Sequence, residues 1–206
     1  MYHYAGNNPV KYTDPTGRWI DNEDGTFTAE EGDTLYGLYG DDWQSKSGFT
    51  RDPSTLQVGE TVGKLNNWTV TGSGSGVGLF ASAIFFGGGE IDKSWYSMDF
   101  VIEETGEQFS ANFTSTNVSG DDFKIGIGIY AVSIETIGIF EGKKPSPERI
   151  KESFSGESDV VGFSLLYFGV TGSDSGNFTT NTGTFGFSVG APFSYGVEKS
   201  YTMERK

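Results

Sequence analysis

The sequence predicts a mainly β protein, in which a small α+β region is followed by an antiparallel β-barrel or curled β-sheet with one short helix. Two observations carry this prediction. The 206 residues include 31 glycines and 15% aromatic residues but few long helix-forming runs, which is typical of all-β proteins. From residue 76 onward, apolar residues alternate with small or polar ones at a period of two, as they do along strands.

Composition excludes several kinds of chemistry. The net charge of -14 and the pI near 4.3 disfavour nucleic acid as a partner, since binding phosphate backbones needs a basic surface. The chain has no cysteine, so disulfides, thiolate nucleophiles and cysteine-ligated zinc are excluded. The single histidine, His3, lies near the N-terminus, so we expect no histidine-based catalytic triad, metal site or cofactor in the rest of the chain.

The first 18 residues hold two closely spaced turn signals. Asn7-Asn8-Pro9 and Asp14-Pro15-Thr16-Gly17 each contain a proline that fixes φ, and Val10 and Tyr12 between them alternate with polar residues as on a short strand. One interpretation is a turn, a strand and a second turn at the edge of a domain. The pattern Y-x-Y-x-x-N-N-P-x-x-Y-x-D-P-x-G also resembles the closing signature of the Rhs/YD-repeat core of bacterial polymorphic toxins.

This resemblance implies that residues 1–18 end an Rhs core and that the remainder is the variable C-terminal tip of a larger secreted or cell-surface bacterial protein, matched by an immunity partner. Members of the family can cut themselves at this junction, next to a leucine and with help from aspartates. Arg18 stands where that leucine is expected, and the shell that would position the reacting peptide lies outside this sequence. We therefore interpret Asp14 as a turn residue rather than a catalyst.

Residues 19–65 are acidic, polar and rich in turn-forming residues. Gly32 ends an extended segment, Asp33 can cap a helix, and the apolar residues that follow recur at helical spacing. Residues 52–62 then predict a turn or short helix start and a short strand that Gly59 interrupts. The sequence thus predicts a strand, a short helix, a second turn and another strand.

That order is similar to LysM, a small β-α-α-β module that binds N-acetylglucosamine glycans such as peptidoglycan. The matching positions are Gly32, Asp33, Thr34, Leu35, Leu56, Val58, Gly59 and Val62. The resemblance implies a glycan site formed by Gly32, Asp33, Thr34, Leu35, Tyr36 and Trp43. Residues 43–49 lack the Asn-rich loop usual in the family, so two alternatives stay open: Tyr36 and Trp43 stack on a sugar ring, or they form the core of a spacer.

Residues 66–75 are rich in glycine and serine and predict a linker and domain boundary, which leaves residues 76–206 as a Gly-rich all-β C-terminal domain. Turn signals divide that domain into about eight alternating segments, so we expect a meander that closes or curls. The segments with the clearest alternation are 76–86, 96–102, 109–114, 123–139 and 185–197. One helix is expected over 146–154, with Ser146 as N-cap, Pro147 at its first position, and Ile150 and Phe154 on one face.

Several of these strands carry glycine and serine opposite their apolar side chains. Because glycine weakens a strand, its repetition indicates close approach of another layer, sharp curvature or a narrow lumen. Apolar side chains outside and small residues inside are also the pattern of a membrane β-barrel. Acidic residues such as Asp99 and Glu135 within the strands, and a mean hydropathy of -0.36, argue against a barrel that resides constitutively in an outer membrane.

Three functional classes remain. The favoured one is a non-enzymatic effector or binding module at the tip of an Rhs-type protein, with a glycan, a target membrane or an immunity protein as partner. The alternatives are a membrane-inserting pore-forming toxin domain and an enzyme toxin that uses carboxylates or hydroxyls. The adjacent carboxylates Glu103-Glu104 and Asp121-Asp122 sit at turns, where solvated charges are the norm, so we assign no catalytic and no metal-binding residue.

Overall fold

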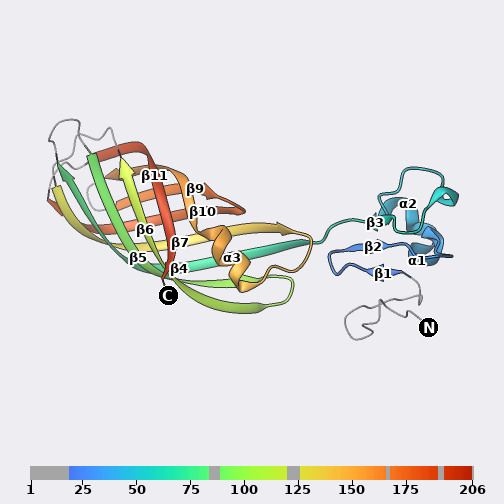
Figure 1. Ribbon diagram of the computed structural model, residues 1–206. Coiled ribbons are helices and arrows are strands. Elements are labelled where there is room, and N and C mark those ends of the chain that lie inside the picture. Colours follow the sequence, from blue (N-terminus) through green and yellow to red (C-terminus); the bar gives the residue numbers. More distant parts are fainter. Residues whose placement is uncertain (1–18, 84–88, 120–125, 166–167, 190–192, 206) are drawn as a thin grey trace. The chain divides into compact units, whose positions relative to one another are not determined.

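The chain forms two compact units, each with its own sheet (Figure 1). A computed structural model describes residues 19–83, 89–119, 126–165, 168–189 and 193–205. The N-terminal unit comprises residues 1–67 with 141–144, and the barrel unit comprises residues 68–140 with 145–206. Strands dominate the described chain, so the predicted mainly β class is confirmed.

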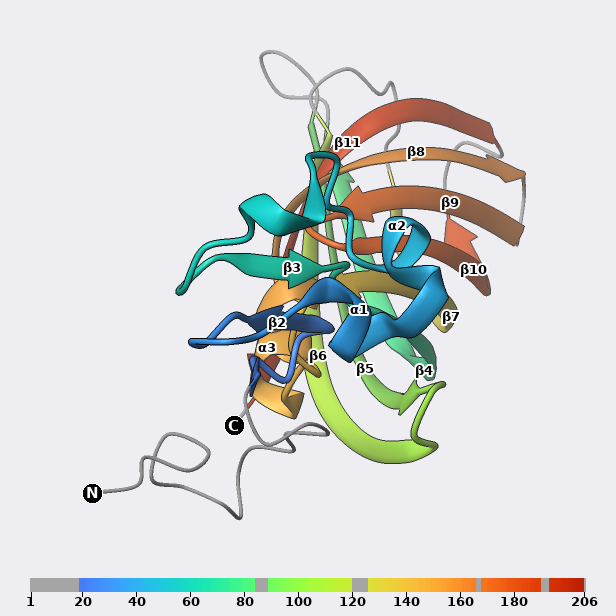
Figure 2. The same ribbon diagram turned by 90° about the vertical axis from the view of Figure 1, so that its right-hand side faces the viewer.

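The N-terminal unit is a three-stranded antiparallel sheet in the order β1-β2-β3, with two short helices between its second and third strands (Figure 2). Trp19, Leu35 and Val62 are almost completely buried in its core. The strand expected over 56–62 begins only at Thr61, because Gly59 turns the chain with φ at +85°. The elements are β1 (Ile20–Asp21), β2 (Thr26–Thr28), α1 (Leu35–Tyr39), η2 (Gly40–Asp42), α2 (Trp43–Lys46), η3 (Pro53–Thr55) and β3 (Thr61–Gly63).

The barrel unit consists of eight strands that close in the order β10-β7-β4-β5-β6-β11-β8-β9. The pairings between described strands are antiparallel, which confirms the predicted antiparallel barrel. The strands are β4 (Asn67–Ala83), β5 (Gly89–Ile102), β6 (Glu107–Ser119), β7 (Gly126–Glu141), β8 (Gly156–Leu165), β9 (Phe168–Ser175), β10 (Phe178–Val189) and β11 (Phe193–Arg205).

The strand order corrects the predicted meander. Strands β4, β5 and β6 are successive neighbours, but β7 returns to lie beside β4; in the same way β8, β9 and β10 are neighbours and β11 returns to lie beside β8. Each set of four is a Greek key, so the barrel is two Greek keys in succession. Residues 185–197, expected as one strand, are split between β10 and β11, which are not neighbours. Alternation fixes which face a residue occupies but not which strand lies next to it.

Helix α3 (Pro147–Phe154) connects β7 to β8 and lies at one end of the barrel, which we call the helix end (Figure 1). It begins as predicted: the Ser146 side chain accepts a hydrogen bond from the Arg149 amide, and Pro147 occupies the first turn. Phe154 enters the barrel, where its ring centroid lies 4.9 Å from that of Phe113 and 5.4 Å from that of Phe100. The helix therefore closes this end with an aromatic cluster.

The predicted linker at 66–75 is wrong, because β4 begins at Asn67 and carries these residues into the barrel wall. Its glycines make room for bulky neighbours. A Cβ added to Gly72 would lie 2.7 Å from a methyl group of Thr136 and 2.9 Å from the Phe100 ring, and one added to Gly76 would lie within 3 Å of the backbone of Tyr96. Glycine here reflects a crowded interior rather than a flexible connection.

We predict that Gly76→Ala lowers the free energy of unfolding by about 1–3 kcal/mol, because the new methyl group meets backbone atoms that cannot move aside. Urea denaturation of the 206-residue chain measures the change. Ser75→Ala, at the exposed neighbouring position of the same strand, is the control and is expected to stay within about 0.5 kcal/mol of the unsubstituted protein. Equal stability of the two variants would contradict this account of the glycines.

Candidate functional site

The predicted junction motif lies outside the described residues. It comprises Asn7, Asn8, Pro9, Asp14, Pro15 and Gly17.

The first four residues of the expected glycan site form the start of α1. Gly32 has φ at +89°, the carboxylate of Asp33 accepts a hydrogen bond of 2.6 Å from the Glu30 amide, and the hydroxyl of Thr34 accepts one of 3.0 Å from the Gly37 amide. Leu35 is 1% exposed and belongs to the core. Thr34, rather than the expected Asp33, therefore caps the helix, while Asp33 bonds back to the turn before it; these roles are structural.

The two aromatic candidates differ in exposure. Tyr36 is 64% exposed on the outer side of α1, whereas Trp43, the first residue of α2, is half-buried and packs against the core of the N-terminal unit. Trp43 thus agrees with the core interpretation of the aromatics. Tyr36 has the open ring face that stacking on a sugar requires.

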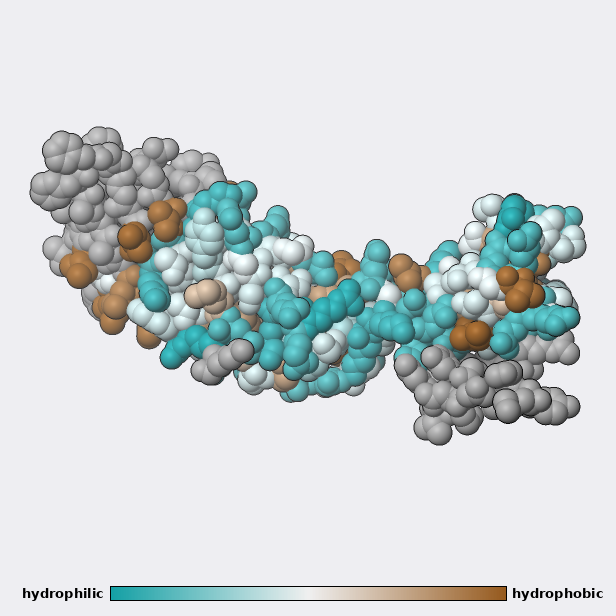
Figure 3. All heavy atoms as spheres, in the orientation of Figure 1, coloured by the Kyte–Doolittle hydropathy of each residue, from teal (hydrophilic) through white to brown (hydrophobic). Residues whose placement is uncertain are grey.

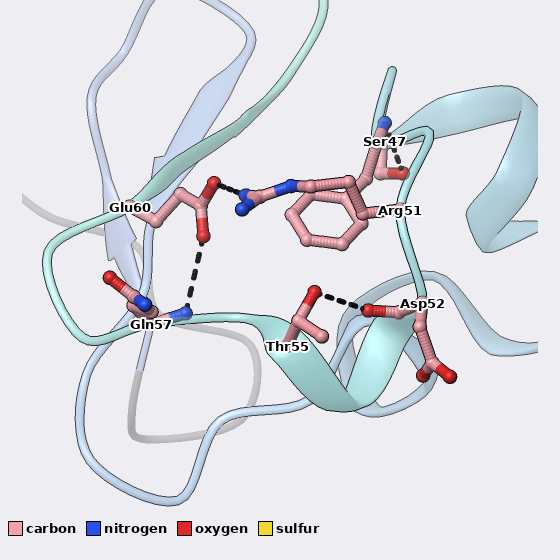
Figure 4. A network of polar contacts seen from close by, with 7 residues as sticks. Ser47, Arg51, Asp52, Thr55, Gln57 and Glu60 are labelled. Atoms are coloured by element: carbon pink, nitrogen blue, oxygen red, sulfur yellow. Dashed lines mark hydrogen bonds and ion pairs between the residues drawn. The ribbon is translucent and has the colours of Figure 1, made fainter.

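A loop between α2 and β3 replaces the Asn-rich loop of the LysM pattern, and an ion pair holds it together (Figure 4). The Arg51 guanidinium contacts the Glu60 carboxylate and lies 4.8 Å from the centre of the Phe49 ring. The other oxygen of Glu60 accepts a hydrogen bond of 3.2 Å from the Gln57 amide. Backbone hydrogen bonds between Ala29 and residues 59–60 join this loop to the segment before α1. The segment before α1 and the segment before β3 therefore lie side by side.

The polarity of the side chains on the inner and outer faces of the barrel changes along its axis. Near α3 its interior is apolar, with Met98, Phe100 and Phe140 fully buried. Towards the opposite end, which we call the far end, inward positions carry hydroxyls such as Ser94, and outward positions carry apolar side chains such as Ile91, which is 60% exposed. At the far end β4, β6, β8 and β10 finish and the strands that pair with them begin.

The outward apolar residues of the far end form a belt, part of which is visible as brown spheres on the left of Figure 3. They come from seven strands, and each lies within about six residues of the strand terminus at that end, as Val77 does from Ala83. The side chains at the corresponding positions of β11 are not among those that the structure describes. We define the apolar belt as Val77, Leu79, Ile91, Val118, Ile127, Ile129, Val161, Phe168, Val170 and Phe185.

Inside the same strands lies a cavity of about 70 Å³. Ten of its sixteen lining residues are serine or threonine, and none is acidic or basic. The lining residues are Ser94, Tyr96, Ser115, Asn117, Val132, Ile134, Phe154, Ser158, Val160, Thr171, Ser173, Ser175, Thr180, Thr182, Ser200 and Thr202.

Hydroxyl pairs connect the strands across this lumen. The Tyr96 phenol lies 2.7 Å from the Ser115 hydroxyl, which lies 2.7 Å from that of Thr202. The Tyr130 phenol donates a hydrogen bond to the Asp92 carboxylate. The Tyr130 ring lies against Gly78 of β4, where an added Cβ would overlap it. Within the described part of the chain, the buried Oδ1 of Asn117 has no hydrogen-bond partner.

Sequence reasoning found the two faces of the strands but missed the hydroxyl-lined lumen. The signal was present as serine or threonine at every second position, for example Thr171, Ser173 and Ser175 on β9. The paired carboxylates behave as expected at a turn: Glu104 accepts hydrogen bonds from the Thr69 amide, and Glu103 accepts one from the Thr71 hydroxyl. Asp121-Asp122 lies outside the described residues.

Comparisons with protein-family models, curated proteins and solved structures found no match. The resemblances to Rhs proteins and to LysM therefore stay predictions. Among the residues that the structure describes, no group of three or more His, Cys, Asp or Glu side chains is arranged to hold a metal ion. No helix in that part of the chain is long and apolar enough to span a bilayer.

Burial raises the pKa of the Tyr96 phenol, an effect that its hydrogen bonds to Ser115 and Thr202 partly oppose. Below pH about 10 the phenol is neutral in both the folded and the unfolded chain, whereas above it the unfolded chain loses its proton first. We therefore predict that the stability of the unsubstituted protein falls more steeply as the pH rises above about 10 than that of Tyr96→Phe. Urea denaturation across this range checks it, with exposed Tyr201→Phe as control; parallel curves for the protein and Tyr96→Phe would refute it.

Proposed function

We propose that the barrel unit is a non-enzymatic effector that inserts its far end into a lipid bilayer, as the variable tip of an Rhs-type secreted protein. The observation that carries this proposal is the apolar belt on seven strands around a lumen lined by hydroxyls. A water-soluble barrel places apolar side chains inside and polar ones outside, and the far end has the reverse arrangement, which is that of barrels in membranes.

A bilayer fits the belt better than a protein partner does. A partner protein covers one side of a barrel, but the belt residues lie on strands that follow one another around it, from β6 through β5, β4, β7, β10 and β9 to β8. Lipid is the environment that contacts all of these strands together. Transferring half-exposed side chains of this size into lipid gains about 1 kcal/mol each, or on the order of 10 kcal/mol for the belt as a whole.

The closed sheet removes the main obstacle to insertion. Backbone groups have no water to bind in hydrocarbon, and a barrel without edges satisfies them internally. On β8 the belt ends at charged groups on the side that faces the helix end. There Lys199 of β11 forms ion pairs of 3.0 Å with Glu157 and 2.6 Å with Asp159, and Asp159 lies two residues before the belt residue Val161. Trp95, the cross-strand neighbour of Val77, lies at the same limit, where aromatic residues are common at membrane interfaces.

The net charge of the protein predicts which headgroup charge the target membrane has. A protein with a charge of -14 is repelled by anionic headgroups, so we expect insertion into zwitterionic membranes, with less insertion as anionic lipid is added.

The junction motif within residues 1–18 supports delivery as part of a larger chain, with an immunity protein as the matching partner.

We predict that the 206-residue protein releases dye from phosphatidylcholine liposomes and that a variant with Ile127→Asn and Ile129→Asn releases at least about tenfold less, because two amides then replace belt side chains on β7. The matched control is Ile137→Asn with Ile139→Asn. It makes the same change at exposed positions of the same strand outside the belt, and it is expected to keep the activity.

Three outcomes would contradict the proposal: no binding to liposomes, equal loss of release in both double variants, or growth arrest of bacteria without leakage that a single carboxylate or hydroxyl substitution abolishes. The last outcome would favour the enzyme alternative. Binding without dye release would keep insertion and remove pore formation.

For the N-terminal unit we propose a second function, binding of an N-acetylglucosamine glycan. The exposed Tyr36 ring beside the Gly32–Thr34 turn supports this proposal. We predict that Tyr36→Ala abolishes retention on peptidoglycan or chitin, whereas Leu65→Ala, which shortens another exposed side chain of the same unit, retains it. Trp43→Ala is a weaker test because that side chain also packs on the core. Failure of the unsubstituted protein to bind either polymer would identify the unit as a spacer.

A further inference from the structure

We propose that the barrel lumen is a binding site for a small uncharged polyol, of the size of glycerol. The site is the cavity of about 70 Å³ inside the barrel, bordered by serine and threonine side chains from both halves of the strands and by the Phe154 ring of α3. It lies on the opposite face of the strands from the apolar belt, so the inference does not depend on membrane insertion.

The volume limits what the cavity holds. At about 10–15 Å³ for each water, 70 Å³ is room for about five to seven waters, which is close to the six non-hydrogen atoms of glycerol.

The lining selects an uncharged ligand with several hydroxyls. None of the described side chains that line the cavity is acidic or basic, so these residues would give an ion no opposite charge in exchange for its lost hydration. The ten serine and threonine hydroxyls can donate or accept, which suits groups that also do both. Apolar ligands would leave these hydroxyls without partners.

Two features give the ligand a defined position. The unpaired Oδ1 of Asn117 is an acceptor that needs a donor, and buried polar atoms in folded proteins are nearly always paired. The apolar part of the lining, Val132, Ile134, Val160 and the Phe154 ring, offers contact to the C–H groups of a polyol. A polyol presents both kinds of group within one small molecule.

Saturation-transfer NMR on the 206-residue protein tests this with glycerol, glycerate and 1-butanol as probes of similar size. We expect saturation transfer from the protein to glycerol and little transfer to glycerate or 1-butanol. An excess of deuterated glycerol should compete with glycerol and lower its signal. Asn117→Leu should weaken glycerol binding by about tenfold, as expected for the loss of one buried hydrogen bond. The control is Asn112→Leu, the same change at an exposed, outward position of β6, which should bind as the unsubstituted protein does.

If Asn117→Leu does not fold, Ser200→Ala on β11 removes a lining hydroxyl instead. The proposal is overturned if glycerol shows no transfer, which would mean that the lumen holds water only. It is also overturned if both asparagine variants bind equally, or if 1-butanol or glycerate binds as well as glycerol.

Discussion

Closure of eight strands into one barrel is the constraint on which the rest of this structure depends. A closed sheet of this size leaves an interior that side chains almost fill, so large inward residues on some strands require small ones on others. Strand β4 supplies that space with inward glycines, including Gly74 beside Met98 and Gly78 beside Tyr130. The residues that resemble a flexible linker in the sequence are therefore required by packing.

The same constraint explains why the two ends of the barrel differ. At the helix end, phenylalanines from β5, β6, β7 and β10 fill the interior together with Phe154. Towards the far end small hydroxyl side chains replace them, and the apolar residues of the alternating pattern lie outside. The period of two is unbroken, yet the apolar set changes face along strands such as β5, from Phe100 inside to Ile91 outside. A single strand thus supplies a core residue, a lumen residue and a belt residue.

This change of face marks what the sequence can predict here and what it cannot. Local signals predicted the helix that starts at Ser146 and the number and approximate positions of the strands, because caps, turns and alternation act between near neighbours. They did not predict the two Greek keys, because β7 lies beside β4 and β10 through contacts between residues distant in the chain. They also misjudged the glycines of β4, whose cause is a side chain on another strand. At the predicted glycan site, Leu35 matches the LysM pattern and Trp43 is a candidate for stacking on a sugar, but both pack in the core of the N-terminal unit, and the sequence alone does not separate these roles.

The two faces of the far half place different and separable demands on the same strands. If the belt inserts into lipid as we propose, it can exchange one aliphatic residue for another because lipid has no fixed shape. The proposed lumen site instead depends on individual hydroxyls and on the Asn117 amide, because its volume is small and its hydroxyls pair with one another. Val118 and Asn117 illustrate this, since they are adjacent on β6 and point to opposite faces. Substitutions one residue apart should therefore act on membrane affinity in one case and on ligand binding in the other, which makes the barrel wall itself the means of testing each proposal without disturbing the other.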